Sequence, residues 1–190
     1  MEIALSIALG IGLSAACGFR IFVPFLVMSV AALSGNLELS SGFEWIGSYP
    51  ALLALAIATA LEIAAYYVPW MDNTLDAIAT PAAIVAGTIA TASVVTDMSP
   101  FLTWTLAVIA GGGIAGVIQS GTVLLRATSS ATTMGVGNFA VASSELAGSV
   151  SASIAAFVMP VATVFLVGVL LVLCVRGLTK ALRKVREASA

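Results

Sequence analysis

Long apolar runs with very few charges constrain the fold of this chain more than any other feature. Of its 190 residues, 61% are hydrophobic and only 8% are charged. Ordinary soluble domains are about 45–50% apolar. Several of the runs approach or exceed the roughly 20 residues that a helix needs to cross a bilayer. The sequence therefore predicts an all-α, polytopic membrane helix bundle, in one integral membrane domain over residues 1–190.

Breaks between the apolar runs predict about six transmembrane or half-membrane segments. The first segment begins at Glu2 and is interrupted near residues 17–24, where Gly18 and Pro24 disfavour a continuous helix. This break would place Arg20 inside the membrane. The later apolar runs cover residues 51–68, 71–95, 101–125 and 150–175.

A polar stretch from Arg126 to Ser149 lies between two of these runs and is rich in hydroxyls and glycines. Lipid offers no hydrogen-bond partners, so non-helical backbone at membrane depth requires surrounding protein or a water-filled cavity. We therefore expect this stretch to form the floor of a site inside the bundle. Asn138 would lie in a broken segment, and residues 139–148, too short to span alone, would form a half-helix.

Ionisable side chains within the apolar segments are the first candidates for a binding site. An arginine at the bilayer centre costs about 3 kcal/mol on insertion scales, so it usually faces the bundle interior and a partner. For Arg20 the alternative is snorkelling to one membrane surface. The expected set of substrate- or ion-binding residues is Arg20, Glu62, Gln119, Arg126, Thr133, Asn138, Ser144 and Glu145.

Residues 66–76 carry aromatic and acidic side chains at the start of another segment. Tyr66, Tyr67 and Trp70 are typical of an aromatic belt at the membrane surface. Asp72 or Asn73 is a plausible N-cap, and Asp76 would lie in the first turn, where the helix dipole favours negative charge. The alternative is a secondary substrate or ion site formed by Asp72, Asn73 and Asp76.

The chain contains no histidine, which excludes His-based acid–base catalysis and the usual zinc ligand sets. We expect no catalytic residues, no metal site and no cofactor. The expected partners are the lipid bilayer and a small-molecule or ion substrate, with no nucleic acid. Small residues at four-residue intervals, Gly112, Gly116 and Ser120, predict close helix packing and would also permit a homo-oligomer.

The distribution of charge predicts the orientation. Basic residues crowd a C-terminal amphipathic tail, residues 176–190, whereas the loop at residues 35–49 carries Glu38 and Glu44 and no Lys or Arg. The positive-inside rule then places the C-terminus in the cytoplasm. Residues 1–97 and 98–182 share an order of glycine-rich helix, glutamate and proline-started helix. This order suggests an inverted repeat of three plus three segments with broken helices, unless Ala-rich sequence produces the match by chance.

Three stretches of this sequence resemble a bacterial membrane-protein family catalogued as domain of unknown function 4126. They are residues 18–24 (GFRIFVP), Glu62 with residues 66–73 (YYVPWMDN), and the stretch from Arg126 to Glu145. Three positions depart from the family pattern: Tyr66 and Leu146 replace common acidic residues, and Ala140 replaces a common proline. The resemblance implies a bacterial inner-membrane location and supports the position of the site. It implies no activity.

Three functions remain open at this point. The first is a small transporter or permease, in which Arg20 and Arg126 neutralise an anionic substrate or pair with Glu62 and Glu145, one of which could carry a coupling proton. The second is a scaffold or subunit in which these Arg–Glu pairs only fix helix register. The third is an intramembrane lipid-modifying enzyme that uses Asp72 and Asp76. We expect the first, and not an enzyme.

Overall fold

The structure is a computed structural model that describes residues 2–188, apart from the side chains of residues 69–76, 184, 185 and 188. The described chain is all-helical and contains no strand, which confirms the predicted fold class. Five helical stretches are long and apolar enough to cross a membrane. The elements are α1 (Glu2–Cys17), α2 (Phe22–Leu33), η1 (Glu44–Gly47), α3 (Tyr49–Tyr66), α4 (Pro69–Val94), α5 (Pro100–Leu106), η2 (Ala107–Gly112), α6 (Gly113–Thr133), α7 (Asn138–Val158) and α8 (Pro160–Ala188).

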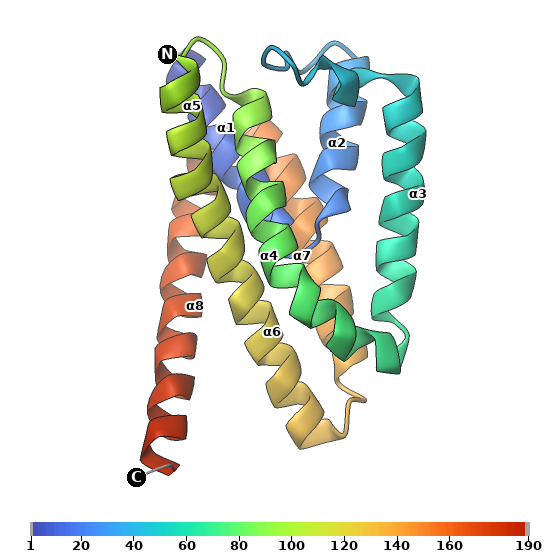
Figure 1. Ribbon diagram of the computed structural model, residues 1–190, viewed down its shortest axis with the longest axis vertical. Helices are drawn as coiled ribbons and strands as arrows, with labels where there is room; N and C mark the ends of the chain where they lie inside the picture. Colours follow the sequence, from blue (N-terminus) through green and yellow to red (C-terminus); the bar gives the residue numbers. More distant parts are fainter. Residues whose placement is uncertain (1, 189–190) are drawn as a thin grey trace.

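Helices α1 and α2 form a hairpin whose turn lies inside the bundle. α1 has 16 residues and α2 has 12, so each is shorter than the roughly 20 residues that cross a bilayer. Figure 1 shows α1 running inward from the end that holds the N-terminus and α2 returning to that same end. The turn covers residues 18–21, which confirms the predicted break. Gly18 fits this turn because a Cβ there would lie 2.8 Å from the carbonyl oxygen of Ala115 in α6.

Helices α3 and α4 run in opposite directions beside this hairpin (Figure 1). α3 follows Ser48, whose hydroxyl accepts a hydrogen bond from the backbone N–H of Ala51 at 3.3 Å. α4 begins at Pro69, a first-turn position where no N–H donor is needed. The predicted N-cap at Asp72 or Asn73 is therefore wrong, because the helix has already begun there.

The segments α5, η2 and α6 form one continuous candidate span of 34 residues. At about 1.5 Å per residue it extends about 50 Å, well beyond the ~30 Å hydrocarbon layer. Its η2 segment is a π-helix that no sequence pattern predicted. The helix ends where Met134 and Gly135 adopt positive φ angles of 54° and 88°, a conformation typical of helix C-termini.

The polar stretch from Arg126 to Ser149 is helical on both sides of that turn, so its broken backbone is limited to the turn itself. Its first part continues α6 and its last part belongs to α7. Hydroxyls of this stretch, such as those of Thr128 and Ser143, donate to backbone carbonyls one turn earlier in the same helix. This bonding satisfies them without breaking the helix. The predicted half-helix at 139–148 is wrong, because α7 continues to Val158 before α8 begins.

Close contacts between small residues hold α4 against α1 and the long helix. A Cβ on Gly87 of α4 would lie 2.5 Å from the Cβ of Ala115, which leaves no room for a larger residue. Gly112 and Gly116 face Ile84 of α4 in the same way. The small-residue face predicted from the sequence therefore packs within the chain, against α4.

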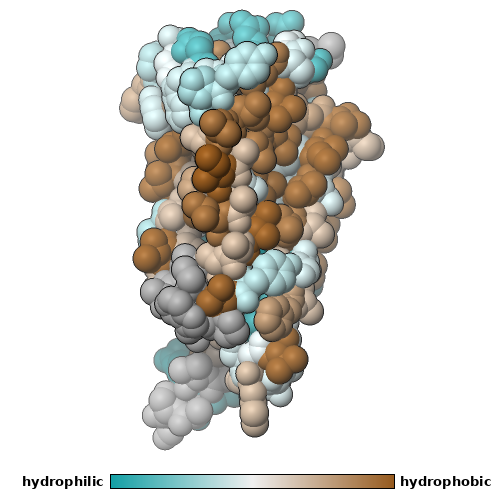
Figure 2. All heavy atoms as spheres, turned by 90° about the vertical axis from the view of Figure 1, so that its right-hand side faces the viewer, coloured by the Kyte–Doolittle hydropathy of each residue, from teal (hydrophilic) through white to brown (hydrophobic). Residues whose placement is uncertain are grey.

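Large apolar side chains cover the outside of the helices. Figure 2 shows a broad apolar band over the middle of the molecule and a polar cap at one end. On α8, Phe165, Leu166 and Leu173 are all more than half exposed. Exposed apolar surface of this extent is typical of contact with lipid or with a protein partner. Together with the five candidate spans, it supports the predicted membrane character of the bundle.

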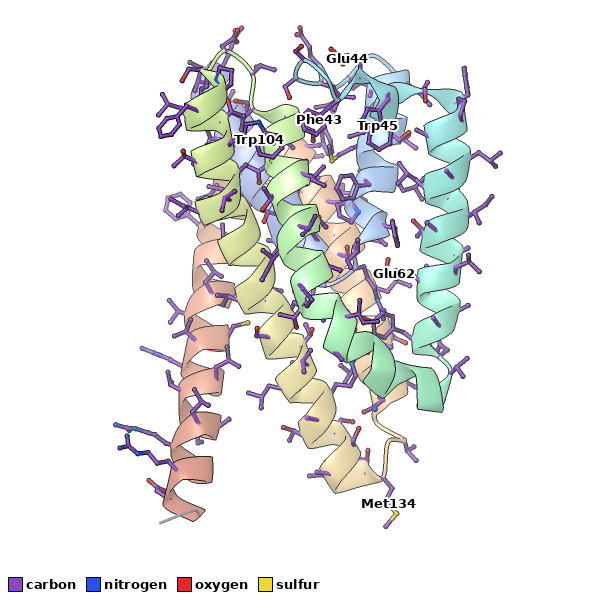
Figure 3. The ribbon with its side chains drawn as sticks, viewed as in Figure 1. Phe43, Glu44, Trp45, Glu62, Trp104 and Met134 are labelled. Carbon is purple, nitrogen blue, oxygen red and sulfur yellow. The ribbon has the colours of Figure 1, made fainter. Side chains whose placement is uncertain are left out.

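The predicted inverted repeat is not confirmed. Residues 1–97 begin with two short antiparallel helices, whereas residues 98–182 begin with one continuous helix of 34 residues. Arg20 lies in the buried turn between the short helices. Asn138 instead starts α7 just after the turn at Met134, which Figure 3 places at the far end of the molecule.

Candidate functional site

Arg20 lies at the tip of the α1–α2 hairpin, and its side chain is only 1% exposed. Its Nη2 donates a hydrogen bond to the carbonyl oxygen of Ala142 in α7 at 3.0 Å. Its Nε and Nη1 have no hydrogen-bond acceptor among the described residues. Because Nε carries one N–H group and Nη1 carries two, most of the donors of this buried guanidinium are unused.

Glu145 of α7 joins Arg20 to a second buried arginine, Arg126 of α6. Its Oε2 accepts a hydrogen bond from Arg126 Nη2 and lies 3.3 Å from Arg20 Nη2. The side chains of Arg126 and Glu145 are 2% and 3% exposed. The two residues lie at similar distances along the chain from the turn at Gly135, so the antiparallel packing of α6 and α7 brings them opposite each other.

Tyr66, at the end of α3, supports both guanidinium groups. The Cζ atoms of Arg20 and Arg126 lie 3.9 Å and 4.3 Å from the centroid of its ring. Such cation–π contacts contribute about 0.5–2 kcal/mol each, with the larger values at desolvated sites. Tyr66 is buried, so the predicted place in an aromatic belt is wrong for this residue. A signal was present: Tyr66 lies one turn after Glu62, on the same face of α3.

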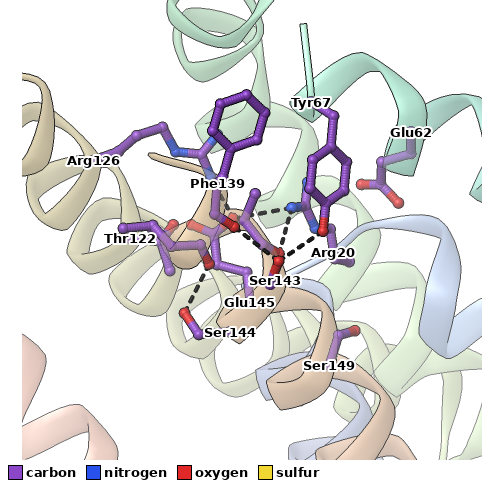
Figure 4. A network of polar contacts seen from close by, with 12 residues as sticks. Arg20, Glu62, Tyr67, Thr122, Arg126, Phe139, Ser143, Ser144, Glu145 and Ser149 are labelled. Atoms are coloured by element: carbon purple, nitrogen blue, oxygen red, sulfur yellow. Dashed lines mark hydrogen bonds and ion pairs between the residues drawn. The ribbon is translucent and has the colours of Figure 1, made fainter. Parts of the chain in front are cut away.

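Glu62 of α3 holds the hairpin turn through its backbone. Its Oε1 accepts the N–H of Ile21 at 2.7 Å, and its Oε2 accepts the N–H of Phe22 at 3.1 Å. These N–H groups lie at the start of α2, which has no side-chain N-cap of its own, and a carboxylate is favoured at a helix N-terminus. Figure 4 shows Glu62 and Arg126 on opposite sides of Arg20.

Three further contacts fix α7 against its neighbours. The hydroxyl of Tyr67 lies 2.8 Å from Ser143 Oγ, and its ring stacks on Phe139 with centroids 6.0 Å apart. Ser149 Oγ donates to the carbonyl oxygen of Ala16, near the end of α1, at 3.0 Å. Sequence reasoning missed these contacts because periodicity shows which face of a helix is buried and does not show which helix covers it.

The structure thus brings together four of the predicted binding residues, with Tyr66 as an added member. We call this group the arginine cluster; it consists of Arg20, Glu62, Tyr66, Arg126 and Glu145. Gln119 is buried in α6, as expected, about two turns before Arg126. Figure 3 shows Glu62 between the two ends of the bundle, well away from Glu44 at one end and Met134 at the other.

Besides Gln119, three predicted binding residues lie outside the arginine cluster. The hydroxyl of Thr133 accepts the N–H of Gly137 at 2.9 Å, within the α6–α7 turn. Asn138 Nδ2 donates to Ser130 Oγ at 2.9 Å, across the same turn. Ser144 is exposed, and its hydroxyl donates to a carbonyl of its own helix. The structure gives Thr133 and Asn138 roles in the turn.

The predicted secondary site cannot be placed in this geometry, since the side chains of Asp72, Asn73 and Asp76 lie outside the described residues. Among the side chains that the structure does describe, no three His, Cys, Asp or Glu residues lie together as metal ligands. The described chemistry is therefore that of the arginine cluster. Guanidinium groups such as those of Arg20 and Arg126 form charge-assisted hydrogen bonds with carboxylates and other anionic groups.

Comparison with known proteins identifies a family for this chain but does not indicate an activity. A family model described as domain of unknown function (DUF4126) matches residues 7–180 of this chain. No curated protein matches the chain. No solved structure matches it either.

Proposed function

We propose that this chain, which belongs to the family described as domain of unknown function (DUF4126), is a small membrane transporter or permease for a small anionic solute. The observation that carries the proposal is the charged, non-helical turn at Arg20, buried within a bundle of apolar helices. Non-helical backbone at membrane depth is tolerated where protein or a water-filled cavity surrounds it. Ionisable residues at that depth usually belong to a solute or ion pathway.

The hydrogen bonding of Arg20 favours a role in binding. A purely structural arginine would be expected to use its donors, because each buried donor without an acceptor costs about 1–3 kcal/mol. Nε and Nη1 of Arg20 instead lack acceptors among the described residues. An anion or a water molecule that passes the hairpin tip would supply acceptors for these two nitrogen atoms.

We further propose that the protein lies in the inner membrane of a bacterial cell with its C-terminus in the cytoplasm. Glu38, Glu44 and Asp97 lie in the loops at the end of the bundle that holds the N-terminus, whereas the basic residues of α8 lie toward the opposite end. The positive-inside rule favours a cytoplasmic C-terminus for this arrangement. The part of α8 beyond Arg176 would then lie at the anionic headgroups.

A scaffold or membrane subunit is the second candidate, and Glu145 favours it. Its carboxylate already contacts both arginines, so the cluster satisfies part of its charge without any solute. In that case the ion pairs would hold α6, α7 and the hairpin in register. The scaffold hypothesis predicts stability effects in Arg20 variants and no solute flux.

Solute flux into liposomes tests the proposal. Purified protein is reconstituted, and light scattering follows the uptake of chloride, nitrate, formate, acetate and the neutral solutes glycerol and urea. Transport predicts uptake of at least one anion well above that of protein-free liposomes, with little change for the neutral solutes. Uptake equal to protein-free liposomes for every solute, with and without a pH gradient, would favour the scaffold.

A further inference from the structure

The arginine cluster already holds one carboxylate, that of Glu145. A single oxygen of this side chain, Oε2, contacts the Nη2 atoms of both Arg20 and Arg126. The ring of Tyr66 makes a cation–π contact with each of the two guanidinium groups. Glu145 thus acts as an internal ligand, and its position shows that the two arginines can bind a carboxylate.

The hold on this internal ligand is unequal. Arg126 Nη2 donates a hydrogen bond to Glu145 Oε2, whereas Arg20 Nη2 lies 3.3 Å from the same oxygen and donates its hydrogen bond to the carbonyl of Ala142. Arg20 also keeps Nε and Nη1 without an acceptor in the described part of the chain. Arg20 is therefore the arginine on which a second anionic group would gain most hydrogen bonds.

We infer that Arg20 and Arg126 form a carboxylate-binding clamp, and that the transported solute is a small monocarboxylate that takes the place of Glu145 on Arg20. This inference rests on the proposed transport function. Guanidinium groups bind carboxylates through paired, charge-assisted hydrogen bonds. Among the described side chains, two arginines already face two carboxylates, Glu62 and Glu145, so a monoanion adds the smallest charge to them.

The test removes the carboxylate of Glu145 by mutation and supplies a small carboxylate in solution instead. Glu145→Ala removes the carboxylate and leaves both arginines in place. We expect a lowered Tm for this variant in detergent, and partial recovery when formate or acetate is added. At a hundredfold excess over Kd the recovery should be about 5–10 °C. Chloride at equal ionic strength should give much less.

Two controls assign the effect to the clamp. Glu38→Ala removes an exposed carboxylate in a loop at one end of the bundle, away from the arginine cluster, so its Tm should not respond to formate or acetate beyond the response to chloride. The double variant Glu145→Ala/Arg20→Gln should lose the recovery. Recovery that persists without Arg20, or no preference for carboxylate over chloride in the single variant, would overturn the inference.

A second variant covers the case in which Glu145→Ala does not fold. Glu145→Gln keeps the shape of the side chain and removes its charge, and it should bind acetate in a calorimetric titration at least tenfold more tightly than wild type. Equal or weaker binding would contradict the inference. If neither variant folds, acetate must raise the Tm of the wild type above that in equal chloride, and a failure to do so overturns the clamp.

The outcomes for the clamp and for transport can be told apart, because these measurements involve no flux. Anion uptake by the wild type together with no carboxylate response would remove the clamp and leave transport standing. Carboxylate recovery together with no uptake of any solute would leave the clamp as a binding site and remove transport.

Discussion

Glu145→Gln changes the shape of one side chain very little, yet we expect it to lower the stability of the fold strongly. The glutamine has the same shape as the glutamate, so it creates no cavity. It removes the negative charge that both Arg20 and Arg126 contact. The two guanidinium groups then remain buried, with Glu62 as the other described carboxylate beside them, and its oxygens are used by the start of α2.

The expected loss follows from the number and burial of these contacts. A hydrogen bond to a charged group contributes about 1.5–3 kcal/mol, and Glu145 contacts two such groups with its side chain 3% exposed. Removing one partner of a buried ion pair costs about 3–5 kcal/mol, because the remaining charge is left in low dielectric. We therefore expect the free energy of unfolding to fall by about 3–5 kcal/mol, which for a chain of this length lowers Tm by roughly 10 °C.

Thermal unfolding in detergent, followed by far-UV circular dichroism, measures this effect. Glu38→Gln is the matched control, since it makes the same chemical change at an exposed side chain and should alter stability by less than about 0.5 kcal/mol. A Glu145→Gln protein within about 2 °C of the control would show that the ion pairs contribute little. The reasoning about buried charge in this cluster would then be refuted.

Three other substitutions probe the parts that position the cluster. Gly87→Ala should lower stability by about 1–3 kcal/mol, because its Cβ would lie 2.5 Å from that of Ala115. Gly168→Ala is the control, because a Cβ there would have no atom within 4 Å. Equal Tm values for the two variants would contradict the close packing at Gly87. Glu62→Gln should cost about 1–2 kcal/mol, since a charged acceptor for two N–H groups of the hairpin is lost, and faster amide exchange at the start of α2 would report it. Ser149→Ala should cost about 1 kcal/mol through the lost hydrogen bond to α1, and an unchanged Tm would argue against that contact.

The sequence predicted the elements of the fold better than their connections. Apolar runs and scarce charges predicted an all-helical bundle, and Gly18 with Pro24 predicted the break beside Arg20, which the structure confirms. The polar stretch after Arg126 was predicted to be broken, with only a half-helix at residues 139–148, whereas the structure has two continuous helices there. Its hydroxyls bond to carbonyls of their own helix, so polar composition there does not exclude a helix.

The candidate site was predicted in part for a similar reason. Ionised groups in apolar segments must find partners, and this rule selected Arg20, Glu62, Arg126 and Glu145, which the structure brings together. It could not show that Glu145 bridges both arginines while Glu62 binds the backbone of the hairpin, because these pairings depend on which helices are neighbours. Tyr66 was missed because a tyrosine at a helix end is equally typical of a membrane surface.

The most direct test of the account compares solute flux through Arg20→Gln with flux through Arg183→Gln. Both variants remove one positive charge, the first at the buried hairpin tip and the second at an exposed position of α8. Both are reconstituted in equal amounts after gel filtration has shown a folded protein. The account predicts that Arg20→Gln loses at least tenfold in the uptake rate of the anion that the wild type carries, while Arg183→Gln keeps it. Wild-type uptake by Arg20→Gln would contradict the claim that the hairpin tip binds the solute.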